Sequence, residues 1–197
     1  VIGSYLISRT LKEEGVDTLF YLMGGPDFDI VMAAEDLGIR TIDFRHEQAA
    51  AFAAHAYARV TGKPGVCTAA SGPGTLNLLT GVYTAAIDCA PMAILGGASA
   101  VHEIGRDAFQ EVDQVSVLDP LVKYSHRTTM AARYPEIVST AFRQSLAGRP
   151  GPVYIDCGAD VLYEEIEEED AVRPSRAARR TRPVAEPGAV KEVVDML

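Results

Sequence analysis

Positive charge is scarce in this sequence, which has 18 Lys and Arg residues against 27 Asp and Glu residues and a formal net charge of -9. Binding to nucleic acid or to an anionic membrane needs clustered basic residues, so this balance argues against both partners. The chain also has no apolar run as long as a membrane span. Residues 1–20 are typical of an amphipathic helix and a strand rather than of a targeting peptide. We therefore expect a cytoplasmic protein.

Cysteine is scarce as well. Cys67, Cys89 and Cys157 are odd in number, stand in apolar neighbourhoods and show no paired spacing. This pattern favours buried free thiols over metal ligands or a disulfide.

The usual phosphate-binding motifs are also missing. The sequence has neither the GxGxxG spacing of a dinucleotide site nor the Gly-Lys-Ser/Thr of a P-loop. Its nearest equivalent is SGPG, residues 71–74, after a predicted strand. Glycine lets a flat ligand come close to the backbone, but it also serves simple turns, so these residues alone leave both interpretations open.

Hydrophobic periodicity predicts alternating strands and helices, and hence an α/β fold: a three-layer parallel sheet of about six strands with helices on both faces. With 197 residues, 48% of them hydrophobic, the chain is long enough for one large domain. The expected strands are 18–22, 40–44, 65–70, 92–95, 122–126 and 152–156, the expected helices are 2–14, 28–37, 47–61, 75–88, 115–118 and 135–146, and 96–113 is expected to be a loop.

The composition changes after residue 164, where EEIEEED precedes an Arg-rich and Pro-containing stretch. Such a charge run is typical of an exposed linker. We expect a domain over 1–165, a linker over 166–187, and a helix beginning in 188–197 that opens a further domain of a longer polypeptide.

Glu47 stands where a short apolar strand gives way to an Ala-rich helix that Gly62 and Pro64 end. In an open α/β sheet, small molecules bind in the crevice at such strand-to-helix switches. An acid among apolar neighbours such as Phe44 and Phe52 is partly desolvated, which favours proton exchange. The alternative is a first-turn Glu that points into water and is favoured by the helix dipole.

Four stretches together resemble one known family: RHEQAAAFAAHAYARVTGKPGVC from residue 45, SGPGTLN from 71, DAFQE from 107 and GRPGPVYID from 148. They are similar to the N-terminal pyrimidine-binding domain of thiamine diphosphate-dependent enzymes of the acetolactate synthase-like superfamily. The resemblance covers about residues 1–165 in order. It implies thiamine diphosphate as cofactor and an enzyme that cleaves or forms a carbon–carbon bond next to a carbonyl.

The resemblance also implies roles for particular residues. Glu47 matches the glutamate that shares a proton with the aminopyrimidine ring and so favours the tautomer that generates the reactive ylide. Gly24, Gly72, Pro73 and Asn77 would contact the cofactor. The substrate pocket would include Met23, where acetolactate synthases usually carry Pro, together with Phe109 and the catalytic Gln110; simple packing is the alternative for Phe109.

Within the superfamily, DCAPMAILGGAS from residue 88, AFQE and GRPGPVYID look closest to 2-hydroxyacyl-CoA lyases and oxalyl-CoA decarboxylases. IGRDAFQE is also similar to acetolactate synthases, so the substrate is expected to be an acyl-CoA or a 2-keto acid. In these families Mg²⁺ and the diphosphate bind a second domain with a GDG sequence, which this chain lacks. The resemblance therefore implies a homo-oligomer, dimer or tetramer, with a split subunit that needs a partner chain as the alternative.

Overall fold

The computed structural model describes residues 1–174 and 184–197. These residues include a six-stranded sheet, parallel throughout, with the strand order β2-β1-β3-β4-β6-β5. The strands are β1 (Thr18–Leu22), β2 (Arg40–Asp43), β3 (Gly65–Ala69), β4 (Met92–Ala98), β5 (Ser125–Arg127) and β6 (Pro152–Gly158). The predicted α/β fold with about six parallel strands is thus confirmed.

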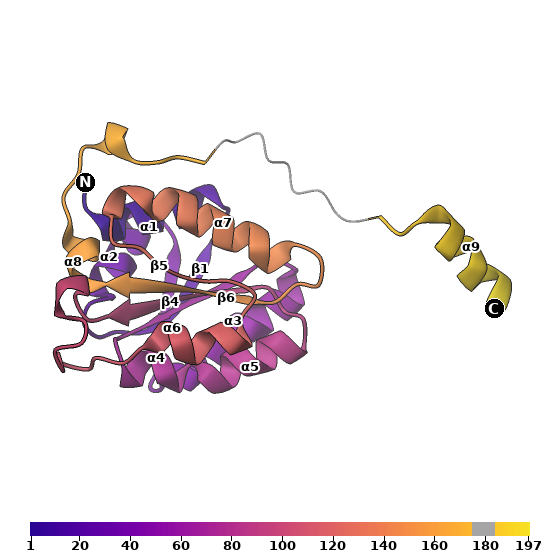
Figure 1. The fold of residues 1–197 in the computed structure, drawn as a ribbon, viewed down its shortest axis with the longest axis horizontal. Helices are drawn as coiled ribbons and strands as arrows, with labels where there is room; N and C mark the ends of the chain where they lie inside the picture. Colours follow the sequence, from indigo (N-terminus) through magenta and orange to yellow (C-terminus); the bar gives the residue numbers. More distant parts are fainter. Residues whose placement is uncertain (175–183) are drawn as a thin grey trace.

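Helices cover both faces of the sheet (Figure 1): α1, α2, α7 and α8 lie on one face, and α3, α4, α5 and α6 lie on the other. The α-helices are α1 (Gly3–Glu13), α2 (Phe28–Asp36), α3 (Glu47–Thr61), α4 (Pro73–Asn77), α5 (Leu79–Ile87), α6 (Gln114–Leu118), α7 (Tyr134–Leu146), α8 (Ala159–Tyr163) and α9 (Pro187–Met196). Short 3-10 helices span Val101–Glu103, Asp119–Leu121, Ala131–Arg133 and Glu168–Asp170. No helix among the described residues is long and apolar enough to cross a membrane.

Burial along the strands follows from their place in the sheet. Every residue of β3, β4 and β6 is buried, as expected for parallel strands covered by helices on both faces. The two edge strands, β2 and β5, are partly exposed. One apolar core lies between the sheet and α1, α2 and α7, and a second lies between the sheet and α3 and α5.

The order of the strands creates a crevice at one end of the sheet. From β1 the chain passes through α2 to β2 on one side, and from β2 it returns through α3 to β3 on the other side of β1. Connections that leave in opposite directions place their helices on opposite faces, because crossovers are right-handed. The carboxyl ends of β1 and β3 therefore flank a topological switch point, where open α/β sheets bind ligands.

Several predicted boundaries were wrong. The helix expected over 75–88 is two helices, α4 and α5, that meet at Leu78. Strand β4 continues through Gly96 to Ala98, into the expected loop, because β6 pairs with it residue by residue as far as Gly158. The strand expected over 122–126 is shorter and later, Ser125–Arg127, and pairs with β6 alone. Helix α8 was not predicted.

The thiols follow the prediction in two of three positions. Cys67 and Cys157 are free and buried, and burial raises the pKa of the Cys67 thiol to about 12. Cys89 is free but only half-buried, which corrects the prediction for that residue. The Arg149 guanidinium Nε donates a hydrogen bond to its sulfur at 2.8 Å.

The first residues of the segment expected to be a linker pack on the domain. Ile166 exchanges backbone hydrogen bonds with Val1 and is partly buried against the core, and Ala171 is 8% exposed. The Arg-rich part of the expected linker, residues 175–183, lies outside the described residues. The helix expected in 188–197 is present as α9.

Candidate functional site

Three segments meet at the carboxyl ends of β2, β1 and β3, which are neighbours in the sheet. They are the start of α3 after β2, the loop of residues 23–27 after β1, and the turn of residues 71–74 after β3. A fourth segment, residues 107–114, follows β4 and covers the turn. The sequence predicts functional residues in all four segments, and the structure brings the segments together.

Glu47 is the first residue of α3, and His46 caps the helix through its Nδ1, which accepts from the Gln48 N–H at 3.2 Å. A carboxylate in this position is stabilised by the helix dipole. Glu47 is half-buried, and its Oε2 accepts a hydrogen bond from the Asn77 side-chain amide at 3.0 Å. Glu47 and Asn77, which are 30 residues apart in the chain, therefore form one polar pair beside the turn.

The turn of residues 71–74 requires glycine at its second position. Gly72 has φ of 61° and ψ of -114°, which a residue with a side chain rarely adopts. A Cβ at this position would also lie 2.4 Å from the Gln110 carbonyl oxygen. The close neighbour of Gly72 in this structure is thus protein backbone. Pro73, the first residue of α4, is exposed.

The loop of residues 23–27 approaches the same turn. Gly24 has no room for a side chain, because a Cβ there would lie 2.5 Å from the Ala70 Cβ. The Gly25 carbonyl accepts from the Ser71 N–H at 3.1 Å, which joins the loop to the turn. The Met23 side chain is 47% exposed at this end of the sheet.

Asp27 is a site residue that the sequence analysis missed. Its side chain is fully buried beneath the loop, Oδ1 accepts from the Gly24 N–H at 3.2 Å, and Oδ2 has no hydrogen-bond partner. Burial raises the pKa of this carboxyl from 3.8 to about 7, and the charge of Glu47 acts in the same direction. The backbone N–H groups of Asp27 and Gly24 and the Thr68 hydroxyl oppose the shift.

The segment of residues 107–111 forms the outer wall. Gln110 has φ of 57°, and its side-chain oxygen accepts from the Ser71 hydroxyl at 3.1 Å. Phe109 does not pack in the core, because its side chain is 85% exposed. The Glu111 carboxylate accepts from the backbone N–H groups of Gly105 and Ala108, which lowers its pKa and shapes the loop.

Gln114 is the second residue that the sequence analysis missed. It is 1% exposed, and its side-chain oxygen accepts from the Gly72 N–H at 2.6 Å. A glutamine at the start of a short helix gives no sequence signal of such a contact, since glutamine is common on exposed helix faces.

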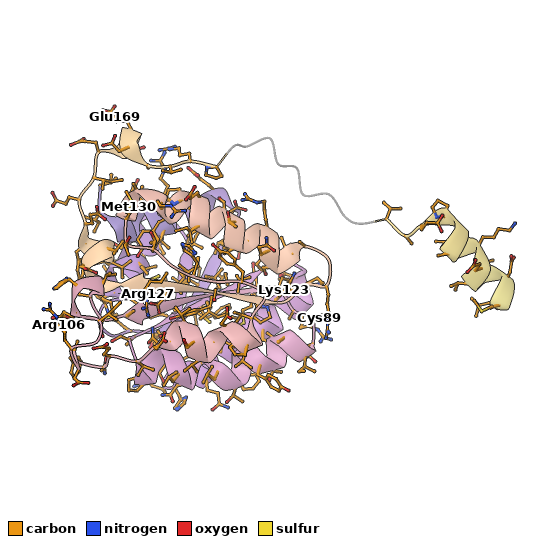
Figure 2. The ribbon with its side chains drawn as sticks, viewed as in Figure 1. Cys89, Arg106, Lys123, Arg127, Met130 and Glu169 are labelled. Atoms are coloured by element: carbon orange, nitrogen blue, oxygen red, sulfur yellow. The ribbon has the colours of Figure 1, made fainter. Side chains whose placement is uncertain are left out.

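The described residues also line a groove of about 1040 Å³, but this groove lies at the opposite end of the sheet. Figure 2 shows Cys89, which lines the groove, at the end of the sheet opposite to Arg106. The two cations that line the groove have acidic partners: Lys63 pairs with Asp17, and Arg59 pairs with Asp88. We therefore place the functional site at the carboxyl ends of the strands and not in this groove.

No group of three or more His, Cys, Asp or Glu side chains within residues 1–174 and 184–197 is placed to hold a metal ion. The polar groups that converge beside the turn are the Glu47 carboxylate, the Ser71 hydroxyl, the backbone N–H of Gly72 and three side-chain amides, those of Asn77, Gln110 and Gln114. Such a set suits a flat, nitrogen-containing ring better than a cation, because it offers both donors and acceptors in hydrogen-bond reach.

Comparison with known proteins agrees with this geometry. The family profile described as "Thiamine pyrophosphate enzyme, N-terminal TPP binding domain" matches residues 2–117. The acetolactate synthase of Arthrospira platensis is 42% identical over 171 residues, which are 85% of this chain and 30% of that protein. The 2-hydroxyacyl-CoA lyase 1 of Mus musculus is 41% identical over 162 residues, 82% of this chain and 28% of that protein.

A third relative extends the similarity toward the carboxyl end of the chain. The probable acetolactate synthase large subunit of Methanocaldococcus jannaschii is 36% identical over an aligned stretch of 198 positions, which covers 99% of this chain and 34% of that protein. The chain thus spans about a third or less of the length of these curated relatives. Both named activities occur among the relatives at similar identity. The chain belongs to the family of thiamine pyrophosphate enzymes and contains their N-terminal TPP-binding domain.

Proposed function

We propose that this chain provides the pyrimidine-binding half of a thiamine diphosphate-dependent active site that cleaves or forms a carbon–carbon bond next to a carbonyl. The observation that carries the proposal is the Glu47 carboxylate at the start of α3, held by Asn77 beside the glycine turn at the switch point of the sheet. Family membership supports the choice of cofactor.

The residues present fit an aminopyrimidine ring. Glu47 offers a carboxylate next to the turn, since its Oε1 would lie 3.5 Å from a Cβ at Gly74. A side chain at position 74 would therefore contact both Ala70 and the carboxylate. Asn77 fixes the other carboxylate oxygen through its amide, so that the carboxylate keeps one orientation. A carboxylate held in this way is suited to share a proton with a ring nitrogen.

Thiamine diphosphate, when bound, supplies the nucleophilic carbon and accepts the electron pair of the broken bond. The protein's side chains and backbone groups bind the cofactor and orient its pyrimidine ring. Glu47 holds a proton between its carboxylate and the pyrimidine ring nitrogen, and Asn77 orients Glu47. Gly72, Pro73 and Gly24 belong to the turn and the loop that would lie against the ring, while Gln110 and Ala70 occupy the space next to the two glycines.

The substrate side of the site is formed by exposed groups. Met23 and Phe109 offer apolar surface, and both are exposed at the carboxyl end of the sheet. Gln110 faces the same region from the outer wall, where the Ser71 hydroxyl holds its side-chain oxygen. We assign these three residues to the substrate pocket, with Gln110 as the catalytic member that orients a substrate carbonyl.

We propose a 2-hydroxyacyl-CoA lyase-like or oxalyl-CoA decarboxylase-like reaction in preference to acetolactate synthesis. Met23 supports this choice, because this position of the loop is usually Pro in acetolactate synthases. Acetolactate synthase-like condensation of 2-keto acids is the second candidate, favoured by the 42% identity to the Arthrospira enzyme.

Two assays test these proposals. Isothermal titration calorimetry of the intact protein from its source with thiamine diphosphate and Mg²⁺ tests cofactor binding, and turnover of that protein is then compared for formyl-CoA with an aldehyde and for pyruvate alone. Glu47→Gln is expected to keep binding and lose turnover, while Glu192→Gln, a change at an exposed residue of α9, keeps both. Turnover with pyruvate only would reject the lyase assignment in favour of the second candidate.

We further propose that residues 1–165 form the pyrimidine domain, 166–187 a linker and 188–197 the start of a central domain. In this arrangement Mg²⁺ and the diphosphate bind a further domain, and the active site forms between subunits of a homo-oligomer. The mass of each chain of the protein from its source tests this. A chain much heavier than 21.1 kDa supports a longer polypeptide, and a 21.1 kDa chain in complex with a different chain supports a split subunit.

A further inference from the structure

The Gln114 side chain joins the glycine turn to the interior of the sheet. Its Oε1 accepts from the Gly72 N–H at 2.6 Å. On the other side, its Nε2 lies 3.0 Å from the Gly97 carbonyl, 2.9 Å from the Tyr154 hydroxyl and 2.8 Å from Asp156 Oδ1. One buried amide thus contacts the turn after β3, the end of β4 and the inner face of β6.

The network continues to the edge of the sheet. Asp156 is fully buried, and its two oxygens have different partners: Oδ1 accepts from the Tyr154 hydroxyl, and Oδ2 accepts from the Arg127 Nε. Arg127 is the last residue of edge strand β5, and its side chain is 24% exposed. Figure 2 places Arg127 over the sheet, on the side of the molecule where Arg106 lies. A continuous chain of polar contacts therefore runs from Gly72 to a partly exposed arginine.

These contacts matter most for the turn, because Gly72 has no side chain with which to hold its own conformation. Its N–H is buried, and a buried N–H without a partner is costly. The backbone of Gly72 also adopts a conformation that needs support from its surroundings. Gln114 supplies that support, and its own amide is fixed by the bonds to Gly97, Tyr154 and Asp156.

We propose that Gln114 is a positioning residue for the pyrimidine-binding turn, which it locks to the buried Asp156–Arg127 pair. The part of this inference that concerns the cofactor rests on the proposed function. Gln114 does not touch the reacting atoms. It sets the position of the Gly72 backbone, against which the ring would lie.

The first test needs no cofactor. Amide hydrogen exchange at Gly72 is followed by NMR in the cofactor-free protein, with the amides of β3 as a reference for opening of the whole sheet. Gln114→Met keeps the length of the side chain and removes both polar atoms, so exchange at Gly72 is expected to become roughly tenfold faster or more while the β3 amides change little. The matched control is Gln144→Met, at an exposed position of α7, which is expected to leave Gly72 as in the wild type.

A second variant separates loss of the bond from general misfolding. Tyr154→Phe disturbs the same buried network by removing the hydroxyl that contacts Gln114 Nε2 and Asp156 Oδ1, but it leaves the Gln114 oxygen that accepts from the Gly72 N–H. Protection of Gly72 is therefore expected to stay near the wild-type value in Tyr154→Phe, even where Gln114→Met loosens the whole sheet. Exchange at Gly72 that is unchanged in Gln114→Met, or equally fast in Gln114→Met and Tyr154→Phe, would overturn the proposal.

The link to the cofactor has its own readout. Gln114→Met is expected to raise the Kd for thiamine diphosphate with Mg²⁺ roughly tenfold, as for one lost hydrogen bond. The C2-proton exchange rate of the bound cofactor is expected to stay unchanged. Unchanged Kd despite faster Gly72 exchange would overturn the positioning role. If the intact wild-type protein from its source binds no thiamine diphosphate, the proposed function fails, and exchange at Gly72 alone decides whether Gln114 holds the turn.

Discussion

Replacing Asp27 with Asn is expected to stabilise the protein in a manner that depends on pH. The carboxyl is fully buried, only one of its oxygens has a partner, and burial raises its pKa to about 7. In the unfolded chain the same group is solvated and titrates near 3.8. At neutral pH and above, folding therefore confines a charge that water would solvate better.

The sign and size of the effect follow from proton linkage. Between pH 4 and pH 7 the folded state keeps a proton on Asp27 that the unfolded state has released, so the free energy of unfolding falls as pH rises through this range. Above the pKa of Asp27 in the folded state, the free energy of unfolding falls no further on account of this group. A difference of about three pKa units corresponds to ~4 kcal/mol at about 1.4 kcal/mol for each unit.

Asp27→Asn preserves the shape of the side chain and the oxygen that accepts from the Gly24 N–H, but it carries no charge. The variant is expected to exceed the wild type by up to ~4 kcal/mol in free energy of unfolding at pH 8, and to lie within about 1 kcal/mol of it at pH 4.5. Asp36→Asn, at the exposed end of the helix α2 that Asp27 precedes, serves as the control and is expected to change stability by less than ~0.5 kcal/mol at both pH values.

Urea unfolding followed by far-ultraviolet circular dichroism, at several pH values from 4.5 to 8, measures these differences. The difference between wild type and variant isolates Asp27, because all other titrating groups are common to both proteins. A difference that stays constant with pH would refute the raised pKa. A variant that is less stable than the wild type at pH 8 would show that the ionised carboxylate has a compensating partner.

Two further predictions concern the turn and the thiols. Gly72→Ala is expected to lower the free energy of unfolding by about 1–3 kcal/mol, because it combines a strained φ with a Cβ 2.4 Å from the Gln110 carbonyl oxygen; wild-type stability in urea would contradict this. In the folded protein, iodoacetamide at pH 8 is expected to alkylate Cys89 and to spare Cys67 and Cys157, whose pKa values burial raises; peptide mass spectrometry that finds either buried thiol modified as fast as Cys89 would contradict that assignment.

The sequence predicted the parts of the fold in which local pattern and burial agree. Strand β1 has its predicted bounds, Thr18–Leu22, and α3 begins at Glu47 as expected. The end of β4 could not be predicted, because Gly96 and Gly97 are residues typical of turns. They are in a strand because β6 pairs with them. Residue 96 is glycine because a Cβ there would lie 2.5 Å from the Tyr154 hydroxyl.

In the site too, some residues could be predicted from local sequence signals and others could not. Glu47 and the glycine turn carry local signals, namely a helix start and a positive-φ position. Asp27 and Gln114 carry none, because an Asp before a helix is typical of a cap and a Gln in a short helix is typical of an exposed face. Their importance arises from contacts between distant segments: Gln114 reaches Gly72 across 42 residues, and Asp27 lies in the field of Glu47.

Exchange of the C2 proton of bound thiamine diphosphate tests the central claim most directly, because it reports on the proton that Glu47 is proposed to share with the pyrimidine. The measurement follows deuterium incorporation at C2 by NMR after acid quench, in the wild type and in Glu47→Gln, with Glu192→Gln as the control. We predict fast exchange in the wild type and the control, and a loss of about two orders of magnitude or more in Glu47→Gln with the cofactor still bound. Equal exchange in the wild type and Glu47→Gln would contradict the role assigned to Glu47.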